Sequence, residues 1–372
     1  RQRVCNEVCC VMEGKYIYGI INSNSEATLA IIGPRGSGPV YTIAHKGLAC
    51  VLSDYTGREL ASMSKEEVVR CLLAHQIVVE QVMKKHTVLP VKFGTVLATP
   101  DEVLDLLSQG HQQFVEALAW IADKVEVEVA ATWDTAQVLR EISAEPEIVR
   151  AREAIASRPG QPTVEERIRL GQMVKTFMDR RRDSYRERML DFLQPVAIDV
   201  QPNALVSEQM VMNVAFLVEK VNQKEFDSQV GQLNDLFRGQ INFRIIGPLP
   251  PYSFASVEVT RPNWEKLSEA QRMLGLPQVI SEARVRKAYR EMAAACHPDL
   301  NPGDNLAGER LAKIQEASSL QLAYSRGAEG LGDPEKGLLL TGEVVERAFL
   351  INIRRSATEV PQSTYNVALP LQ

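Results

Sequence analysis

Cysteine is scarce in this sequence, and none of its six residues forms a C-x-x-C pair with another. Few, scattered cysteines in a chain of 372 residues predict reduced thiols, as in a cytosolic protein. Long apolar runs are missing too, since the longest, at 210–218, falls short of the roughly 18 residues of a membrane span. The net charge is −5, whereas phosphate binding needs a basic surface. These absences predict a protein with no membrane span and no nucleic-acid partner.

The sequence also lacks the motifs of common catalytic and cofactor sites. The glycine-rich stretch GPRGSGPV (33–40) has no Lys-Ser/Thr pair and does not fit G-x-G-x-x-G, so we expect a hairpin loop there. Cys296, His297 and Asp299 are near neighbours in the chain, whereas triad members usually come from separate elements, and no further zinc ligands follow at suitable spacing. We therefore predict a non-enzyme without cofactor or metal. An enzyme that uses a cleft of the first domain is kept as a remote alternative.

An N-terminal α+β domain is predicted over 16–137, after a flexible lead-in at 1–15. YIYGII (16–21) is rich in β-formers, and KVEVEVAATWD (124–134) alternates like a half-buried edge strand. The order of strands, helix, strand, helix and strand predicts a ferredoxin-like sheet with helices on one face.

Two helices of this domain have clear start signals. Ser64 and Glu67 form a capping box, and Thr99 is an N-cap before a proline at the first helical position. His75 and His111 lie on the apolar stripes of these two helices. We expect packed histidines at both positions rather than ligands or catalytic bases.

A charged helical linker region is predicted over 138–200. Thr163 and Glu166 form a capping box at the start of its longest helix. That helix carries a basic run, for which we expect a solvated face with acidic partners at i,i+4. A docking surface for a partner or an acidic neighbouring domain is the alternative. The run comprises Arg180, Arg181, Arg182, Arg186 and Arg188.

A second, small ferredoxin-like α/β domain is predicted over 201–262, from a strand, a helix near 223–239 and a strand interrupted by prolines. Residues 338–360 are a candidate strand returning to this sheet. The sequence leaves open whether 344–355 is a helix or a strand. The residues at 361–372 are read as a tail.

The remaining segment, 263–337, predicts a helical module. A short helix ends at Gly275, and a longer helix begins after Ser281. The longer helix has an apolar stripe that ends at Cys296 and an exposed basic side. Pro298 ends it, and a third helix returns over about 307–324.

This segment resembles a DnaJ-type J-domain. The resemblance rests on LGL (274–276), VRKAYREMA (285–293), HPD (297–299) and NPGD (301–304). It implies a helical hairpin whose tip docks on a DnaK-type ATPase chaperone. The residues implied in that contact are His297, Pro298 and Asp299 at the tip, and Arg286, Lys287 and Arg290 as electrostatic support.

The J-domain pattern is incomplete at one point of this chain. Family members usually carry a basic and an aromatic residue just before the tripeptide, where this chain has Ala294, Ala295 and Cys296. Leu300 stands where Lys or Arg is common. A working chaperone contact and a purely structural module both stay open.

The first two domains together resemble the GvpF/GvpL family of gas vesicle proteins. The resemblance covers about 16–260 and rests on the order of several phrases, among them GLACVLSDY (47–55), LPVKFGTVL (89–97) and GPLPPYSF (247–254). It implies a minor vesicle component that acts in assembly or nucleation and binds the hydrophobic shell protein GvpA, in gas vesicles of the cytoplasm. A general J-domain co-chaperone with unrelated clients is the alternative.

Overall fold

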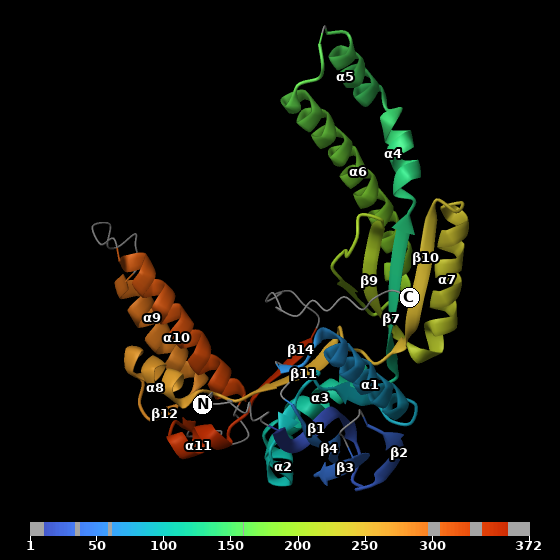
Figure 1. The fold of residues 1–372 in the computed structure, drawn as a ribbon. Coiled ribbons are helices and arrows are strands. Elements are labelled where there is room, and N and C mark those ends of the chain that lie inside the picture. Colours follow the sequence, from blue (N-terminus) through green and yellow to red (C-terminus); the bar gives the residue numbers. More distant parts are fainter. Residues whose placement is uncertain are drawn as a thin grey trace, which may run out of the picture. The chain divides into compact units, whose positions relative to one another are not determined.

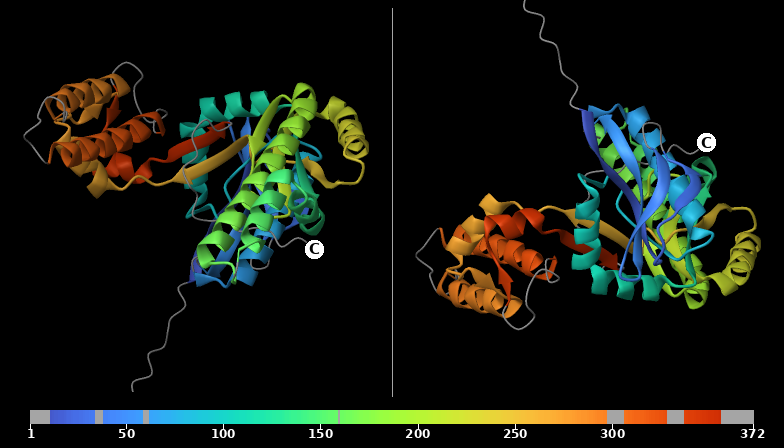
Figure 2. Two further views of the ribbon diagram at one scale, coloured as in Figure 1. Left: turned by 90° about the horizontal axis from the view of Figure 1, so that it is seen from above. Right: turned by 90° about the horizontal axis from the view of Figure 1, so that it is seen from below.

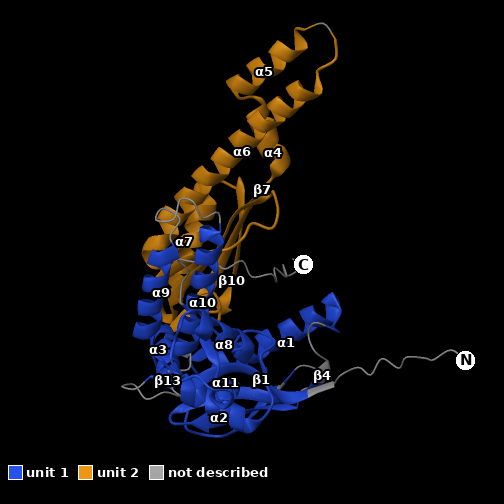
Figure 3. Ribbon diagram, turned by 90° about the vertical axis from the view of Figure 1, so that its left-hand side faces the viewer, with its two compact units in different colours: residues 1–122, 255–355 blue, residues 123–254, 356–372 orange. Residues whose placement is uncertain are grey.

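A computed structural model describes residues 11–33, 38–58, 62–158, 160–296, 306–327 and 337–355. The described chain forms two compact units (Figure 3). The first unit contains residues up to 122 and again from 255 to 355, and the second contains residues 123–254. Helices and antiparallel sheets are mixed in both, which is the predicted α+β class (Figure 1).

The first unit is built on a six-stranded sheet with the order β2-β3-β4-β1-β5, where β6 also pairs with β1. Four strands precede the first helix, whereas one strand does so in the ferredoxin-like plan, so this sheet does not have the order predicted for it. The predicted series already placed several strands before that helix, and the short strand β2 was not recognised. Strand β1 starts inside the predicted lead-in, since its first residues already pair with β4. The strands are β1 (Val11–Asn22), β2 (Thr28–Ile32), β3 (Pro39–His45), β4 (Leu48–Arg58), β5 (Val88–Pro90) and β6 (Val96–Leu97).

Helices cover both faces of this sheet, rather than one face as predicted. Helix α1 (Lys65–Met83) lies on the face where His75 contacts Tyr16 of β1. Helices α2 (Pro100–Gln109) and α3 (His111–Ile121) pack on the other face. The predicted start of α1 is confirmed, because the Ser64 and Glu67 side chains make both capping-box hydrogen bonds.

The single helix predicted after Thr99 is two helices that meet at Gly110. The Thr99 hydroxyl accepts from the backbone of Glu102, as an N-cap does. Gly110 has non-helical dihedral angles (φ −89°, ψ 6°). A Cβ atom there would lie 2.4 Å from the Phe114 ring, so only glycine lets the two helices turn so closely.

The second unit is built on a four-stranded antiparallel sheet with the order β10-β7-β9-β8. Together with its helices it has the element order β-α-β-β-α-β, the order of the ferredoxin-like plan. Strand β7 is a central strand of this sheet, which corrects its predicted place as an edge strand of the first domain, because its partners are β9 and β10. The strands are β7 (Lys124–Trp133), β8 (Asp199–Pro202), β9 (Met210–Glu219) and β10 (Ile241–Leu249).

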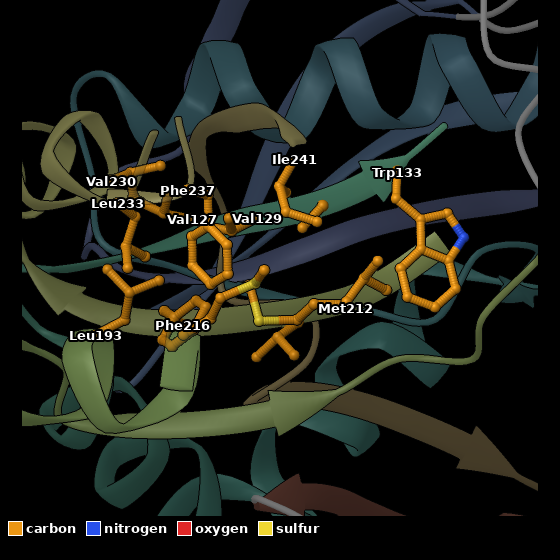
Figure 4. Close-up of a cluster of buried hydrophobic side chains, with 14 of the residues drawn as sticks. Val127, Val129, Trp133, Leu193, Met212, Phe216, Val230, Leu233, Phe237 and Ile241 are labelled. Atoms are coloured by element: carbon orange, nitrogen blue, oxygen red, sulfur yellow. The ribbon is translucent and has the colours of Figure 1, made fainter. Parts of the chain in front are cut away.

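The predicted helical linker is a helical arm of the second unit, residues 135–193, because it starts and ends on strands of one sheet. It consists of α4 (Thr135–Ser143), α5 (Pro146–Ala156) and α6 (Val164–Leu193), and the predicted Thr163 capping box is present. Helix α7 (Gln223–Leu236) packs with the arm on the same core. Figure 4 shows this core, in which Phe216 of β9 lies near Leu193, and Met212 of the same strand lies near Trp133.

A helical module, residues 264–347, follows β11 in the first unit (Figure 2). Helices α9 and α10 pack against each other, and α8 packs on α10. The apolar residues of the module form two clusters of their own. Its elements are α8 (Trp264–Met273), β12 (Val279–Ile280), α9 (Glu282–Cys296), α10 (Ala307–Gly327), β13 (Leu338–Leu339) and α11 (Gly342–Arg347).

The segment whose structure the sequence left open is a helix followed by a strand. Residues 342–347 form α11, and β14 (Leu350–Arg355) pairs antiparallel with β11 (Ala255–Thr260). Both strands belong to the first unit. The predicted return of 338–360 to the second sheet is therefore wrong for its described residues, because β14 pairs with β11 in the first unit.

Candidate functional site

Helix α9 forms the surface that the sequence singled out for partner binding. Its apolar residues pack inward with α8 and α10, around a fully buried Val285. Tyr289, Met292 and Cys296 are partly buried against the same cluster, so the predicted stripe ending at Cys296 is confirmed. A helix held by one apolar face presents its other face to solvent.

A buried polar contact joins α10 to α8, the other helix that packs in this module. The Gln321 side-chain nitrogen donates to the Leu267 carbonyl of α8 over 2.7 Å. Gln321 and Tyr324 are fully buried. Burial of the Tyr324 ring raises the pKa of its hydroxyl to about 12, so this side chain stays neutral inside the module.

The outward face of α9 is basic, as predicted. Arg284, Arg286, Lys287 and Arg290 are all exposed. The Lys287 side chain is 72% exposed and lies 3.9 Å from Glu291, which is a weak surface pair. Among the described residues Arg290 has no ion-pair partner. This face therefore has cationic groups available to an acidic partner.

Glu282 organises the start of this face, a role that the sequence reading missed. Its carboxylate accepts from Arg326 of α10 at 2.6 Å and from Arg286 at 2.5 Å. These hydrogen bonds, that from Arg326 first, lower the pKa of Glu282 to about 2. The i, i+4 spacing of Glu282 and Arg286 was a sequence signal for one of these pairs. Arg286 is thus partly neutralised, which leaves Lys287 and Arg290 as the freer charges.

The predicted tip of the module, His297, Pro298 and Asp299, lies outside the described residues. It follows directly after the last residue of α9. The three basic residues predicted to support the tip, Arg286, Lys287 and Arg290, all lie on α9. Arg286 and Arg290 share one face of this helix because they are four residues apart.

The basic run on α6 pairs with acidic residues, but these lie three residues away or elsewhere in the arm and not at the predicted i,i+4 positions. The side chains of Arg181 and Arg182 are only 22% and 17% exposed, so this part of the face is not solvated as predicted. Arg181 pairs with Glu141 at 2.6 Å and Glu145 at 3.2 Å, and Arg182 pairs with Asp179 at 3.0 Å. Arg186 pairs with Asp183 at 2.9 Å, while Arg180 and Arg188 lie over phenylalanine rings. Most of these charges are thus used within the second unit.

The first unit contains a cavity of about 330 Å³, lined by residues 92–97, 258–261 and Phe349. Its charged groups are already paired: Lys92 binds Glu258, and Arg261 binds Glu102 at 2.6 Å. In the described part of the chain no three His, Cys, Asp or Glu side chains are grouped as metal ligands. The same described residues include no helix long and apolar enough to cross a membrane.

Comparison with known proteins gives two matches, one before the helical module and one within it. A family model for "Gas vesicle synthesis protein GvpL/GvpF" matches residues 14–256, and a DnaJ domain model matches residues 271–321. The first match ends in β11, and the second falls within the helical module.

Individual relatives repeat these two matches. Gas vesicle protein F of a Streptomyces species is 30% identical over 241 residues, which are 64% of this chain and 98% of that protein. The crystal structure of gas vesicle protein GvpF from Anabaena sp. PCC7120 has a TM-score of 0.56 and 25% identity, covering 65% of this chain and 97% of that one. Chaperone protein DnaJ of Synechococcus elongatus is 46% identical over 57 residues, which are 15% of this chain and 20% of that protein.

The family model thus accounts for more than half of the chain, including both sheets and the helical arm, while the DnaJ match accounts for α9 and most of α10. The relatives that match the family region are named gas vesicle protein F, and the relative that matches the helical module is named chaperone protein DnaJ. This chain belongs to the GvpL/GvpF family of gas vesicle synthesis proteins and carries a DnaJ domain after the family region.

Proposed function

We propose that this protein is a gas vesicle assembly factor that binds the hydrophobic shell protein GvpA and recruits a DnaK-type chaperone through the helical module. The observation that carries the proposal is that one chain joins a nearly full-length GvpF region to a DnaJ domain. Shell subunits with exposed apolar surface aggregate before they assemble, and chaperones manage such surfaces. The proposed place of action is the growing gas vesicle in the cytoplasm.

The proposed chaperone contact consists of a tip and a basic face. By their resemblance to the DnaJ tripeptide, His297, Pro298 and Asp299 are assigned to the tip. Arg286, Lys287 and Arg290 on α9 steer an acidic partner surface toward it. Because the side chains of Arg286 and Lys287 are more than half exposed, their attraction to a partner falls with rising salt.

The chaperone half of the proposal is tested with His297→Gln. We expect wild-type protein to stimulate the ATPase of a DnaK-type chaperone, and the variant to lose most of this stimulation with unchanged circular dichroism. Arg167→Gln is a matched control, because Arg167 is an exposed basic residue on a helix of the second unit. If the wild-type protein gives no stimulation, the module is a structural part of the chain.

The shell-protein half is tested by pull-down with purified GvpA. Retention of GvpA well above that of unrelated hydrophobic proteins supports the assembly role. Equal retention of all of them would favour the second candidate, a general DnaJ-domain co-chaperone, for which the DnaJ match is the supporting observation. A crosslinking map between the two proteins would then locate the interface on one of the two units.

A further inference from the structure

The helical module is joined to the core of the first unit at both of its ends through two paired strands. Strand β11 leads into the module, and β14 leads out of it. The two strands pair antiparallel along their whole lengths, from Ala255 opposite Arg355 to Thr260 opposite Leu350 (Figure 1). The family match ends at residue 256 and the DnaJ match at 321, so β14 lies outside both.

The returning segment is part of the core of the first unit. Phe349 is 1% exposed and Ile351 is 8% exposed. Both belong to the apolar cluster that contains Leu106 of α2, Phe114 of α3 and Val257 of β11. The residues after the module are therefore anchored in the family region, and the module is fixed at both ends.

Helix α2 carries a polar stripe that receives this segment. Glu102, Asp105 and Gln109 follow each other at intervals of three and four residues, which places them on one helix face. The buried Gln109 side chain donates to the Arg347 carbonyl over 2.9 Å and accepts from the Phe349 amide over 2.9 Å. Asp105 pairs with the Arg347 guanidinium at 3.2 Å.

Arg261 joins the outgoing and returning ends of the module. It follows directly after β11 and pairs with Glu102 at 2.6 Å. It also donates to the Glu346 carbonyl over 2.9 Å, and its guanidinium lies 4.8 Å from the centre of the Phe349 ring. The stripe on α2 thus contacts one end of the module directly and the other through Arg261.

We infer that the α2 stripe is an intramolecular docking surface, with Gln109 as its positioning residue, which holds the DnaJ domain in one orientation against the sheet of the first unit. A buried glutamine that satisfies two backbone groups sets geometry, because moving the segment would leave both groups without partners. The docking is independent of the proposed function. Its consequence rests on that function: a chaperone on α9 is held at a set place beside the first unit, and does not move on a flexible tether.

The orientation is tested with spin labels at Lys85→Cys and Glu269→Cys, which place one label at the end of α1 and one on α8. Both residues are exposed. The background keeps the buried Cys50 and replaces the other cysteines by serine. We expect one narrow distance distribution in the full-length protein. A broad distribution would overturn the inference, because it is the signature of a tethered module.

The docking residue is tested with Gln109→Met, which keeps the length of the side chain and removes both hydrogen bonds. We expect the distance distribution to broaden and the amides of 346–355 to exchange at least about tenfold faster, while α9 and α10 keep their protection. Gln112→Met on the next helix is the matched control, because Gln112 is exposed and bonds only within α3. Unchanged distances and exchange in Gln109→Met would overturn the assigned role.

A second variant keeps the test decisive if Gln109→Met does not fold. Asp105→Asn removes only a partly exposed ion pair with Arg347. We expect a smaller broadening in the same direction. No change in Asp105→Asn, together with a failure of Gln109→Met to fold, would make Gln109 a general core residue and reject the α2 stripe as a docking surface.

Discussion

The helical arm and the helical module are both long helical excursions from a sheet, but their apolar residues go to different places. The arm contributes Ile142, Ile148 and Met189 to the core of the second sheet. The module surrounds Tyr324 and Val285 with two clusters of its own. An excursion with its own core can be added to an existing fold, whereas one that shares a core is a part of that fold. The family match agrees, because it contains the arm and ends before the module.

The largest expected effect comes from removing a side chain of the shared core. Phe216 is fully buried on β9, with its ring centre 5.2 Å from that of Phe226. Phe216→Ala is expected to cost the second unit about 3–5 kcal/mol of unfolding free energy. Hydrogen exchange should show α6 losing protection together with β7 and β9. If α6 kept its protection while the sheet lost it, the arm would have a core of its own.

The counterpart in the module is Leu267→Ala. Leu267 is fully buried in one of the module clusters, and its carbonyl accepts the Gln321 bond. We expect a loss of about 2–5 kcal/mol that is confined to the module. Amides of α8 and α10 should exchange faster, while β1 and β4 keep their protection. An equal loss in β1 and β4 would show that the module and the first sheet unfold as one.

Features set by neighbours in the chain could be predicted from the sequence. The capping boxes at Ser64 and Thr163 bond residues only three positions apart, so the pattern contains the whole interaction. The stripe of α9 is likewise contained in its spacing. Relatedness to GvpL/GvpF proteins and to DnaJ domains was also predicted and is confirmed.

Features that depend on distant partners could not be predicted. Strand β7 has the alternation of an edge strand, because Glu126 and Glu128 point to one side, yet it pairs on both edges. Nothing near Gln109 in the sequence indicates that its partners are Arg347 and Phe349, more than two hundred positions later. Such pairings depend on topology, which local patterns do not contain.

The smallest expected effect is a change of stability with pH that differs between the two units. His75 is buried, and its Nδ1 lies 3.0 Å from the Tyr16 hydroxyl, which accepts from the Gly94 amide and so has its proton free to donate. Burial lowers the pKa of His75 from 6.5 to about 4. The neutral ring therefore stabilises the first unit above pH 6.5, and this contribution is lost as the pH falls toward 4. The loss amounts to at most roughly 3 kcal/mol.

The buried titratable group of the second unit changes stability with pH in the opposite direction. Burial raises the pKa of Glu126 from 4.5 to about 7, against the hydrogen bonds that Ser253 donates. This carboxyl stabilises the second unit below pH 4.5, and the contribution is lost as the pH rises toward 7. Acidification from pH 7 to pH 4.5 should therefore weaken the first unit and favour the second.

The protein has three tryptophans, and two of them can report on this difference separately. A variant that retains only Trp120 follows the first unit in urea unfolding, and one that retains only Trp133 follows the second. We expect the Trp120 midpoint to fall on acidification and the Trp133 midpoint to hold or rise. His75→Gln should remove the acid response of the first unit, and Glu126→Gln that of the second. Midpoints that move together in both reporters would mean that surface charge, and not these two buried groups, sets the response to acid.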